Sequence, residues 1–198
     1  MTPDEASAAL YAFIRHKPKG IDTTRLTRMR ALIEHAGIGQ PFAVVHVAGT
    51  KGKGSTCAMI TAALRAHGYR VGLYTSPHLH DLRERFVIDG TPIDADTFAE
   101  TVARLLPSLH AVPDVGFPEA TTLLGLAYFE ARAVDVAVME THLGGRYDPT
   151  NITTPSVSVI TTLGYDHTEL LGHTLAEIAW HKAGIMKAGV PAVSAPQP

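Results

Sequence analysis

The chain has 198 residues, a formal net charge of −2, 45% hydrophobic residues and 18% charged residues. This composition is typical of one folded domain and argues against a disordered chain or a broad nucleic-acid interface, which needs clustered excess Lys and Arg. No apolar run approaches the length of a membrane span, and the N-terminus lacks a signal-peptide pattern. A cytoplasmic protein without membrane or nucleic-acid partners is expected, and the single cysteine, Cys57, is expected to be a small core residue.

The chain begins with two predicted helices. Apolar residues at helical spacing predict the first over residues 4–17. Thr23 or Thr24 can cap a second helix that extends to Ala36, where Gly37 is a typical stop.

A predicted buried strand over residues 43–48 leads into a glycine-rich loop and a helix over residues 55–67. The loop reads Gly49-Thr50-Lys51-Gly52-Lys53-Gly54-Ser55-Thr56. Glycines let a backbone approach an anion closely, and the amides and dipole of a helix N-terminus favour phosphate. Lys53 then supplies a cation for terminal phosphates, and Ser55 or Thr56 supplies a hydroxyl. The spacing departs from the standard P-loop, and an ordinary turn with solvated lysines is the alternative, but the strand–loop–helix context favours phosphate binding.

Strands and helices then alternate to the end of the chain. Strands are predicted over residues 71–75, 134–139, 156–161 and 190–194, with a hairpin around Asp89-Gly90. Helices are predicted over residues 95–109, 118–132 and 175–183, and Asp94 can cap the first of them. The alternation predicts an α/β fold with a mostly parallel sheet, P-loop-type, and helices on both faces. Ligands should gather at the carboxyl ends of its strands.

Three polar segments follow predicted strands. Ser76-Pro77-His78-Leu79 follows the second strand, Glu140 ends the third, and Asp166-His167 follows the fourth. Separate strands can thus bring them to one crevice, which predicts an active site there. Glu140 could hold Mg²⁺ through oxygen ligation beside phosphates on the neighbouring loop, the alternative being a solvated glutamate in a turn.

Residues 46–56 resemble the nucleotide loop of the folylpolyglutamate synthase and dihydrofolate synthase family, within the muramyl-peptide ligase superfamily. Residues 26–32 and 140–151 are similar to further family segments, so the resemblance extends along nearly the whole chain. It implies the central nucleotide-binding domain of such a ligase, with ATP and Mg²⁺ as cofactors. One departure is Thr141-His142, where the family usually has a small apolar residue and glycine.

The resemblance also implies roles for individual residues. Ser76, Glu140 and His167 are implied metal ligands, and Asn151 joins the loop residues in binding the nucleotide. Most lysines on helices are solvated, and Lys182 would be expected to be so too. The resemblance instead implies that it matches a family lysine that is carbamylated and bridges to magnesium. With Lys53 and His167, it forms the implied catalytic set. The implied acid-binding residues are Ser76, Pro77, His78, Arg85 and Phe86.

The implied reaction is ATP-dependent amide formation through an acyl phosphate, between a folate- or pteroate-like acid and a glutamate-like amino acid. Family members run well past 198 residues. Residues 1–198 are therefore expected to form one truncated nucleotide-binding ligase domain, with the carboxy-terminal domain absent and poor activity alone. A protein partner or self-association is expected to complete the sheet. A nucleotide- or partner-binding module without turnover is the main alternative, and a P-loop phosphohydrolase is a weaker one.

Overall fold

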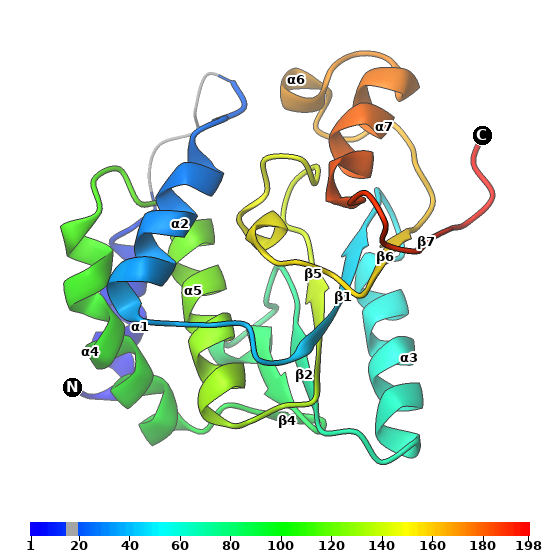
Figure 1. Ribbon diagram of the computed structural model, residues 1–198. Helices are drawn as coiled ribbons and strands as arrows, with labels where there is room; N and C mark the ends of the chain where they lie inside the picture. The colour runs from blue at the N-terminus through cyan, green and yellow to red at the C-terminus, as the bar shows by residue number, and fades with distance from the viewer. Residues whose placement is uncertain (15–19) are drawn as a thin grey trace.

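The computed structural model describes residues 1–14 and 20–198. Within these residues one seven-stranded sheet has the order β4-β3-β2-β5-β1-β6-β7 (Figure 1). The strands are β1 (Ala43–Ala48), β2 (Val71–Tyr74), β3 (Phe86–Ile88), β4 (Thr91–Pro92), β5 (Val136–Glu140), β6 (Val157–Ile160) and β7 (Ala192–Ser194). Strands β2, β5, β1, β6 and β7 run parallel, and β3 and β4 add an antiparallel edge. The predicted mostly parallel α/β fold is confirmed.

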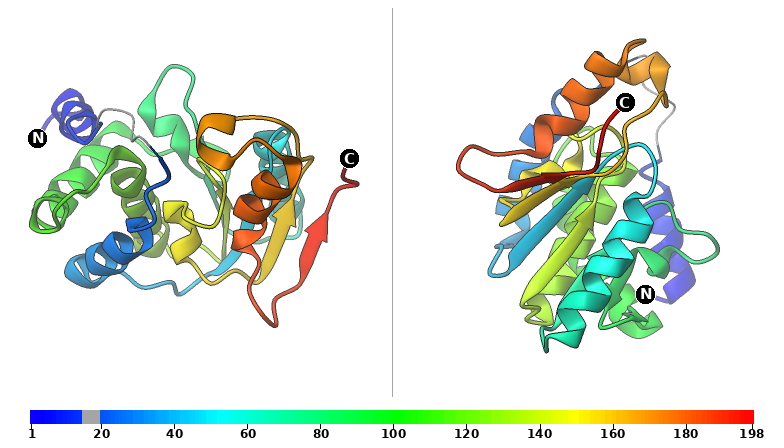
Figure 2. Two further views of the ribbon diagram at one scale, coloured as in Figure 1. Left: turned by 90° about the horizontal axis from the view of Figure 1, so that it is seen from above. Right: turned by 90° about the vertical axis from the view of Figure 1, so that its right-hand side faces the viewer.

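Helices cover both faces of this sheet (Figure 2). The α-helices are α1 (Pro3–Tyr11), α2 (Arg25–Ala36), α3 (Lys53–Ala66), α4 (Ala95–Ala111), α5 (Phe117–Ala131), α6 (Thr168–Leu171) and α7 (Leu175–Lys182). Short 3₁₀ turns are η1 (Leu82–Arg85), η2 (Pro149–Ile152) and η3 (Ala183–Ile185). Of the helices in the described residues, α3 covers one face, whereas α1, α2, α4 and α5 form a layer on the other.

The central strand β1 shows why both faces must be covered. Successive side chains of a strand point to opposite faces. Val44 packs into the large core beneath α2, α4 and α5, while Val45 and Val47 pack with Cys57 of α3 in a second cluster. Cys57 is fully buried there, as predicted, and burial raises the pKa of its thiol.

Several predicted caps and turns are confirmed. Gly37 ends α2 in the left-handed region at φ 63°, and the Asp94 side chain accepts a hydrogen bond from the Thr97 amide at the start of α4. Asp89 and Gly90, at φ 51° and 84°, turn β3 into β4. These short polar and glycine signals act locally, so the sequence pattern was sufficient to place them.

Helix ends differ from their predicted positions. Helix α1 ends at Tyr11 because its last turn tightens, with the Phe13 amide bonding to the Leu10 carbonyl; residues 15–17 of the predicted helix lie outside the described residues. Helix α3 begins at Lys53, earlier than predicted, because Gly52 takes φ 82° and its carbonyl accepts from the Thr56 amide. The short helix α6 was not predicted.

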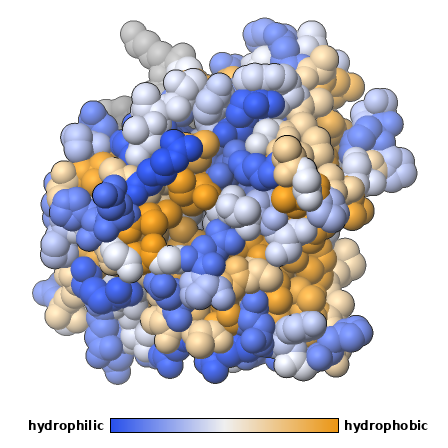
Figure 3. All heavy atoms as spheres, in the orientation of Figure 1, coloured by the Kyte–Doolittle hydropathy of each residue, from blue (hydrophilic) through white to orange (hydrophobic). Residues whose placement is uncertain are grey.

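The face shown in Figure 3 mixes hydrophilic and apolar residues. A cavity of about 390 Å³ lies between α2, α5 and η2, with Ile33, Ile38, Leu126 and Ile152 in its lining. None of the helices in the described part of the chain combines the length and the hydrophobicity needed to span a bilayer.

Candidate active site

The parallel strands bring the predicted polar segments to one edge of the sheet. In the register, Val47 of β1 lies opposite both Glu140 of β5 and Val159 of β6, and Tyr74 of β2 lies opposite Met139. Because these strands run in the same direction, the segments that follow β1, β2 and β6 emerge at the edge where Glu140 ends β5. This shared edge is what the sequence predicted.

The glycine-rich loop is held against the segment after β6. The amide of Thr50 donates to the Thr162 carbonyl at 3.0 Å, and the Thr161 hydroxyl donates to the Lys51 carbonyl at 2.8 Å. A Cβ on Gly49 would lie 1.8 Å from Thr161 Oγ1, so only glycine fits this approach. The loop therefore has a fixed shape, and it leads directly into the N-terminus of α3.

A cavity of about 560 Å³ opens between this loop and the end of β2. It is lined by Gly52, Lys53, Gly54, Ser55, Thr75, Ser76, Pro77, Leu79, Glu84 and Glu140. Within it Lys53 Nζ lies 3.9 Å from Glu140 Oε1, and the Ser76 amide donates to Glu140 Oε2 at 3.3 Å. The start of a helix, a lysine and a carboxylate thus share one cavity, which suits a polyphosphate and a cation.

Glu140 is a buried carboxylate in the lining of the cavity. It is 4% exposed. Burial raises the pKa of its carboxyl, and this effect outweighs the opposing hydrogen bond from the Ser76 amide and the charge of Lys53. A buried carboxylate with one long hydrogen bond has oxygen lone pairs to spare for a hard cation.

The donor set near Glu140 fits Mg²⁺. Magnesium is usually bound by one or two carboxylates together with phosphate oxygens and water. Glu140 and the hydroxyl of Ser76 offer such oxygens beside the phosphate loop. Among residues 1–14 and 20–198, no cluster of three or more His, Cys, Asp or Glu side chains is suited to a metal ion.

His167 lies at the same edge but is not brought against Glu140 by any contact found in the described part of the chain. It precedes α6 in the left-handed region at φ 49°, and its Nε2 lies 3.7 Å from Asp166 Oδ2. Both side chains are about half exposed. The metal-ligand role of His167 stays a prediction.

Lys182 is not a solvated helix lysine. It is 3% exposed, and its Nζ donates a 2.7 Å hydrogen bond to the carbonyl of Gly49. Burial, reinforced by the positive charge of Lys53, lowers the pKa of its amine from 10.5 to about 8. The interpretation of Lys182 as a solvated lysine was therefore wrong, because helix α7 packs its last turn against the loop.

Asn151 is buried in the turn η2 and holds two loops together. Its Nδ2 donates to the carbonyls of Arg146 and Gly184, each at 3.0 Å. Its Oδ1 is buried and has no hydrogen-bond partner among the described residues. These contacts give Asn151 a structural role, and its direct contact with a nucleotide stays a prediction.

The predicted acid-binding residues separate into two groups. Ser76 and Pro77 line the cavity, and His78 accepts a 2.8 Å hydrogen bond at Nδ1 from Arg85 Nε. Phe86 instead is fully buried in the core between Tyr74 and Phe98, so its side chain offers no surface to a ligand. The Phe86 side chain lies on the core face of β3. The polar loop that precedes it in the sequence gives no sign of this orientation.

Helix α1 contributes a side chain that sequence reasoning missed. The hydroxyl of Tyr11 lies 3.3 Å from His78 Nε2, and its ring stacks on Phe117 at 5.7 Å. The Arg85 guanidinium lies over the Phe117 ring, with its Cζ 5.3 Å from the ring centre. Residues 11, 78, 85 and 117 are distant in sequence, so no local pattern could group them.

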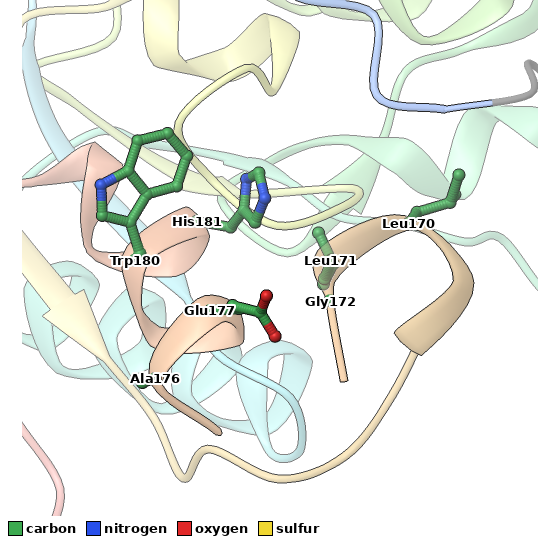
Figure 4. A pocket seen from close by; sticks show the side chains of 7 residues that line it. All are labelled: Leu170, Leu171, Gly172, Ala176, Glu177, Trp180 and His181. Carbon is green, nitrogen blue, oxygen red and sulfur yellow. The ribbon is translucent and has the colours of Figure 1, made fainter. Parts of the chain in front are cut away.

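A further cavity of about 450 Å³ lies between α6 and α7 (Figure 4). It is lined by Leu170, Leu171, Gly172, Ala176, Glu177, Trp180 and His181, none of which lines the loop cavity. Arg146 stacks on Trp180, with Cζ 3.8 Å from the ring centre. No predicted site residue belongs to this cavity.

Comparison with known proteins agrees with this architecture. The family description "Mur ligase middle domain" matches residues 47–193. A folylpolyglutamate synthase of Arabidopsis thaliana is 40% identical over 98% of this chain and 36% of its own length. The dihydrofolate synthase/folylpolyglutamate synthase of Bacillus subtilis is 41% identical over 86% of this chain and 41% of its own length.

Solved structures show the same likeness. A complex of folylpolyglutamate synthase (FPGS) with AMPPCP and folate superposes with a TM-score of 0.92 at 39% identity. The match covers 100% of this chain and 49% of the FPGS chain. The chain thus spans less than half the length of these relatives. It belongs to the folylpolyglutamate synthase and dihydrofolate synthase family, whose N-terminal part it matches, and contains the Mur ligase middle domain.

Proposed function

We propose that this chain binds Mg·ATP at Gly49–Thr56 and acts in an ATP-dependent acid–amino-acid ligase. The observation that carries the proposal is the cavity in which Lys53 lies 3.9 Å from the buried Glu140 at the N-terminus of α3. The acid would be a folate or pteroate, and the amino acid would be glutamate-like.

The roles follow from the positions of the side chains. The loop amides and the dipole of α3 would hold the phosphates, and Lys53 would neutralise charge on the terminal phosphate. Glu140 and Ser76, joined by His167, would hold Mg²⁺, which would further neutralise the charge of the phosphates. Lys182 fixes the start of the loop through the Gly49 carbonyl.

The reaction would proceed in two steps. A carboxylate oxygen of the acid attacks the γ-phosphorus, the bond to ADP breaks, and an acyl phosphate forms. The neutral amine of the amino acid then attacks the acyl carbon, phosphate leaves with the bonding electrons, and the amine loses a proton. Catalysis here is mostly alignment and charge stabilisation. Ser76, Pro77, His78 and Arg85 would border the acid, since they lie beside the phosphate loop or contact one another.

The relatives support the ligase over a binding module without turnover. They are named as synthases, and one structural neighbour holds AMPPCP and folate together. Because the chain matches less than half of each relative, the complete reaction, its substrates and a cytoplasmic location are part of the proposal. The exposed edge strand β7 supports the further proposal that a partner or a second copy pairs with it.

Calorimetry with Mg·ATP tests the nucleotide site. Lys53→Ala should weaken binding about tenfold or more, because a charge-assisted contact to phosphate is lost. Arg104→Ala is the control, because it removes one positive charge from an exposed residue of α4, outside the loop. Equal affinities of the two variants would contradict the phosphate-loop assignment. Amide formation from a folate or pteroate and glutamate, measured for this chain alone and with candidate partners, tests the ligase itself.

A further inference from the structure

Side chains hold the carboxyl ends of β2 and β5 together beyond the last ladder pair. That pair is Tyr74 opposite Met139. Past it, the Ser76 amide donates to Glu140 Oε2 at 3.3 Å, and the Tyr74 hydroxyl lies 2.8 Å from His142 Nε2. The two contacts are two residues apart along each strand end, so the second can set the geometry of the first.

His142 is itself held in place from behind. The amides of His142 and Leu143 both donate to Asp148 Oδ2 at 2.8 Å, and His142 Nδ1 lies 3.5 Å from Asp148 Oδ1. Asp148 is fully buried and is also bonded by Thr150. The imidazole, 12% exposed, is therefore an anchored group and not a surface side chain.

Tyr74 is equally well fixed on its own side. Its ring is fully buried, 5.4 Å from the His142 ring in an edge-on arrangement, and its hydroxyl also contacts Thr121 Oγ1 of α5 at 2.9 Å. The line Asp148–His142–Tyr74 thus joins the turn after β5 to the last residue of β2. Thr75 and Ser76 follow Tyr74 directly in the chain.

We propose that His142 is a positioning residue that, through Tyr74, sets the distance between Ser76 and Glu140. The direct Ser76–Glu140 hydrogen bond is long, and it occupies a carboxylate oxygen that a cation would also claim. If Glu140 Oε2 binds a cation instead of the Ser76 amide, the Tyr74–His142 bond still holds the two strand ends together. This inference rests on the proposed function, because it concerns the metal and phosphate site at that place.

Hydrogen exchange on the 198-residue chain without nucleotide tests the link directly. His142→Ala and Tyr74→Phe should each accelerate exchange of the Thr75 and Ser76 amides about threefold to tenfold, the effect of one buried hydrogen bond. The double variant should add little to either single change. His142→Gln, whose amide can reach the Tyr74 hydroxyl, should restore slow exchange. Additive effects, or unchanged exchange in His142→Ala, would overturn the link.

Calorimetry then tests whether the Tyr74–His142 bond affects the binding of Mg²⁺. His142→Ala should reduce the gain in ATP affinity that Mg²⁺ provides by about threefold to tenfold and leave the affinity without Mg²⁺ unchanged. His142→Gln should recover the gain, which a general loss of packing would not allow. An unchanged Mg²⁺ gain in His142→Ala would overturn the positioning role. If the unmodified chain bound no nucleotide, the proposed function would fail, while hydrogen exchange would still decide on the link.

Discussion

Lys182 donates a hydrogen bond from Nζ to the carbonyl oxygen of Gly49 at 2.7 Å, joining the last turn of α7 to the first residue of the phosphate loop. Helix α7 starts with a capping box in which Thr174 and Glu177 bond each other's backbone amides. A stable start to this short helix therefore helps to fix Lys182 at its end. The loop that we assign to phosphate binding depends in this way on a segment far along the chain.

Lys182 should react with carbon dioxide. Its pKa of about 8 leaves a large share of the amine neutral near that pH, and only the neutral amine attacks carbon dioxide to give a carbamate and a proton. At fixed dissolved carbon dioxide, the yield should therefore rise as the pH rises through 8. Isotopically labelled bicarbonate and NMR would detect the carbamate. The signal should vanish in Lys182→Met and persist in Lys187→Met. A signal that persists in Lys182→Met would contradict this role.

Gly49→Ala should damage the loop more severely than a change at Gly52. The added Cβ would lie 1.8 Å from Thr161 Oγ1, so the loop must shift, at a cost of about 1–3 kcal/mol of unfolding free energy. A Cβ at Gly52 meets open space, so Gly52→Ala should show only the strain of φ 82°.

A double-mutant cycle separates the two causes. Thr161→Ala removes the clashing hydroxyl, so it should recover part of the stability lost in Gly49→Ala and none of that lost in Gly52→Ala. Urea unfolding of the six proteins measures both couplings. Equal recovery at the two glycines would show that the contact with Thr161 does not explain the need for glycine.

The sheet, the phosphate loop and the edge where ligands gather could be predicted because their signals are local. Alternating apolar strands and helices define the sheet, and a strand that runs straight into glycines and a helix defines the loop. Asp94, Gly37 and the Asp89-Gly90 turn act over a few residues, and the structure confirms all three. The parallel direction of the strands then follows from general rules of chain connection, whereas their order, with β5 between β1 and β2, was not predicted.

The contacts that complete the site could not be predicted in this way. Tyr11 meets His78, and Tyr74 meets His142, only after distant elements have packed. The burial of Lys182 likewise depends on where α7 lies, although its sequence pattern alone resembles that of a surface helix. Sequence periodicity reports which side of an element is apolar, but it does not report which polar residue from another element will face it.

Arg28→Met should destabilise the chain strongly. Arg28 of α2 bonds Glu119 of α5 at 2.6 Å and also pairs with Asp22, and the Glu119 side chain is 1% exposed. Removing the arginine leaves this buried carboxylate uncompensated, which costs about 3–5 kcal/mol. Urea unfolding at neutral pH measures the loss. Adding Glu119→Gln should recover much of it, and a loss no larger than that of the exposed Arg104→Met would contradict the argument.

His46 should make stability fall in mild acid. The ring is fully buried in β1, with Nε2 2.8 Å from Thr150 Oγ1, and burial lowers its pKa from 6.5 to about 4. Between these two values the unfolded chain binds a proton that the folded chain excludes. The unfolding free energy should therefore decrease as pH falls from 6.5 to 4, by at most about 3 kcal/mol.

His46→Gln is the matched control, because its amide can reach Thr150 but does not titrate. Its unfolding free energy, followed by urea denaturation across the same range, should change less with pH than that of the unmodified chain. The lowered pKa of the Asp148 carboxyl acts in a separate window, below its ordinary value of 3.8, so the two groups can be told apart. Parallel pH profiles for the two proteins between 6.5 and 4 would show that His46 is not the group whose protonation opposes folding.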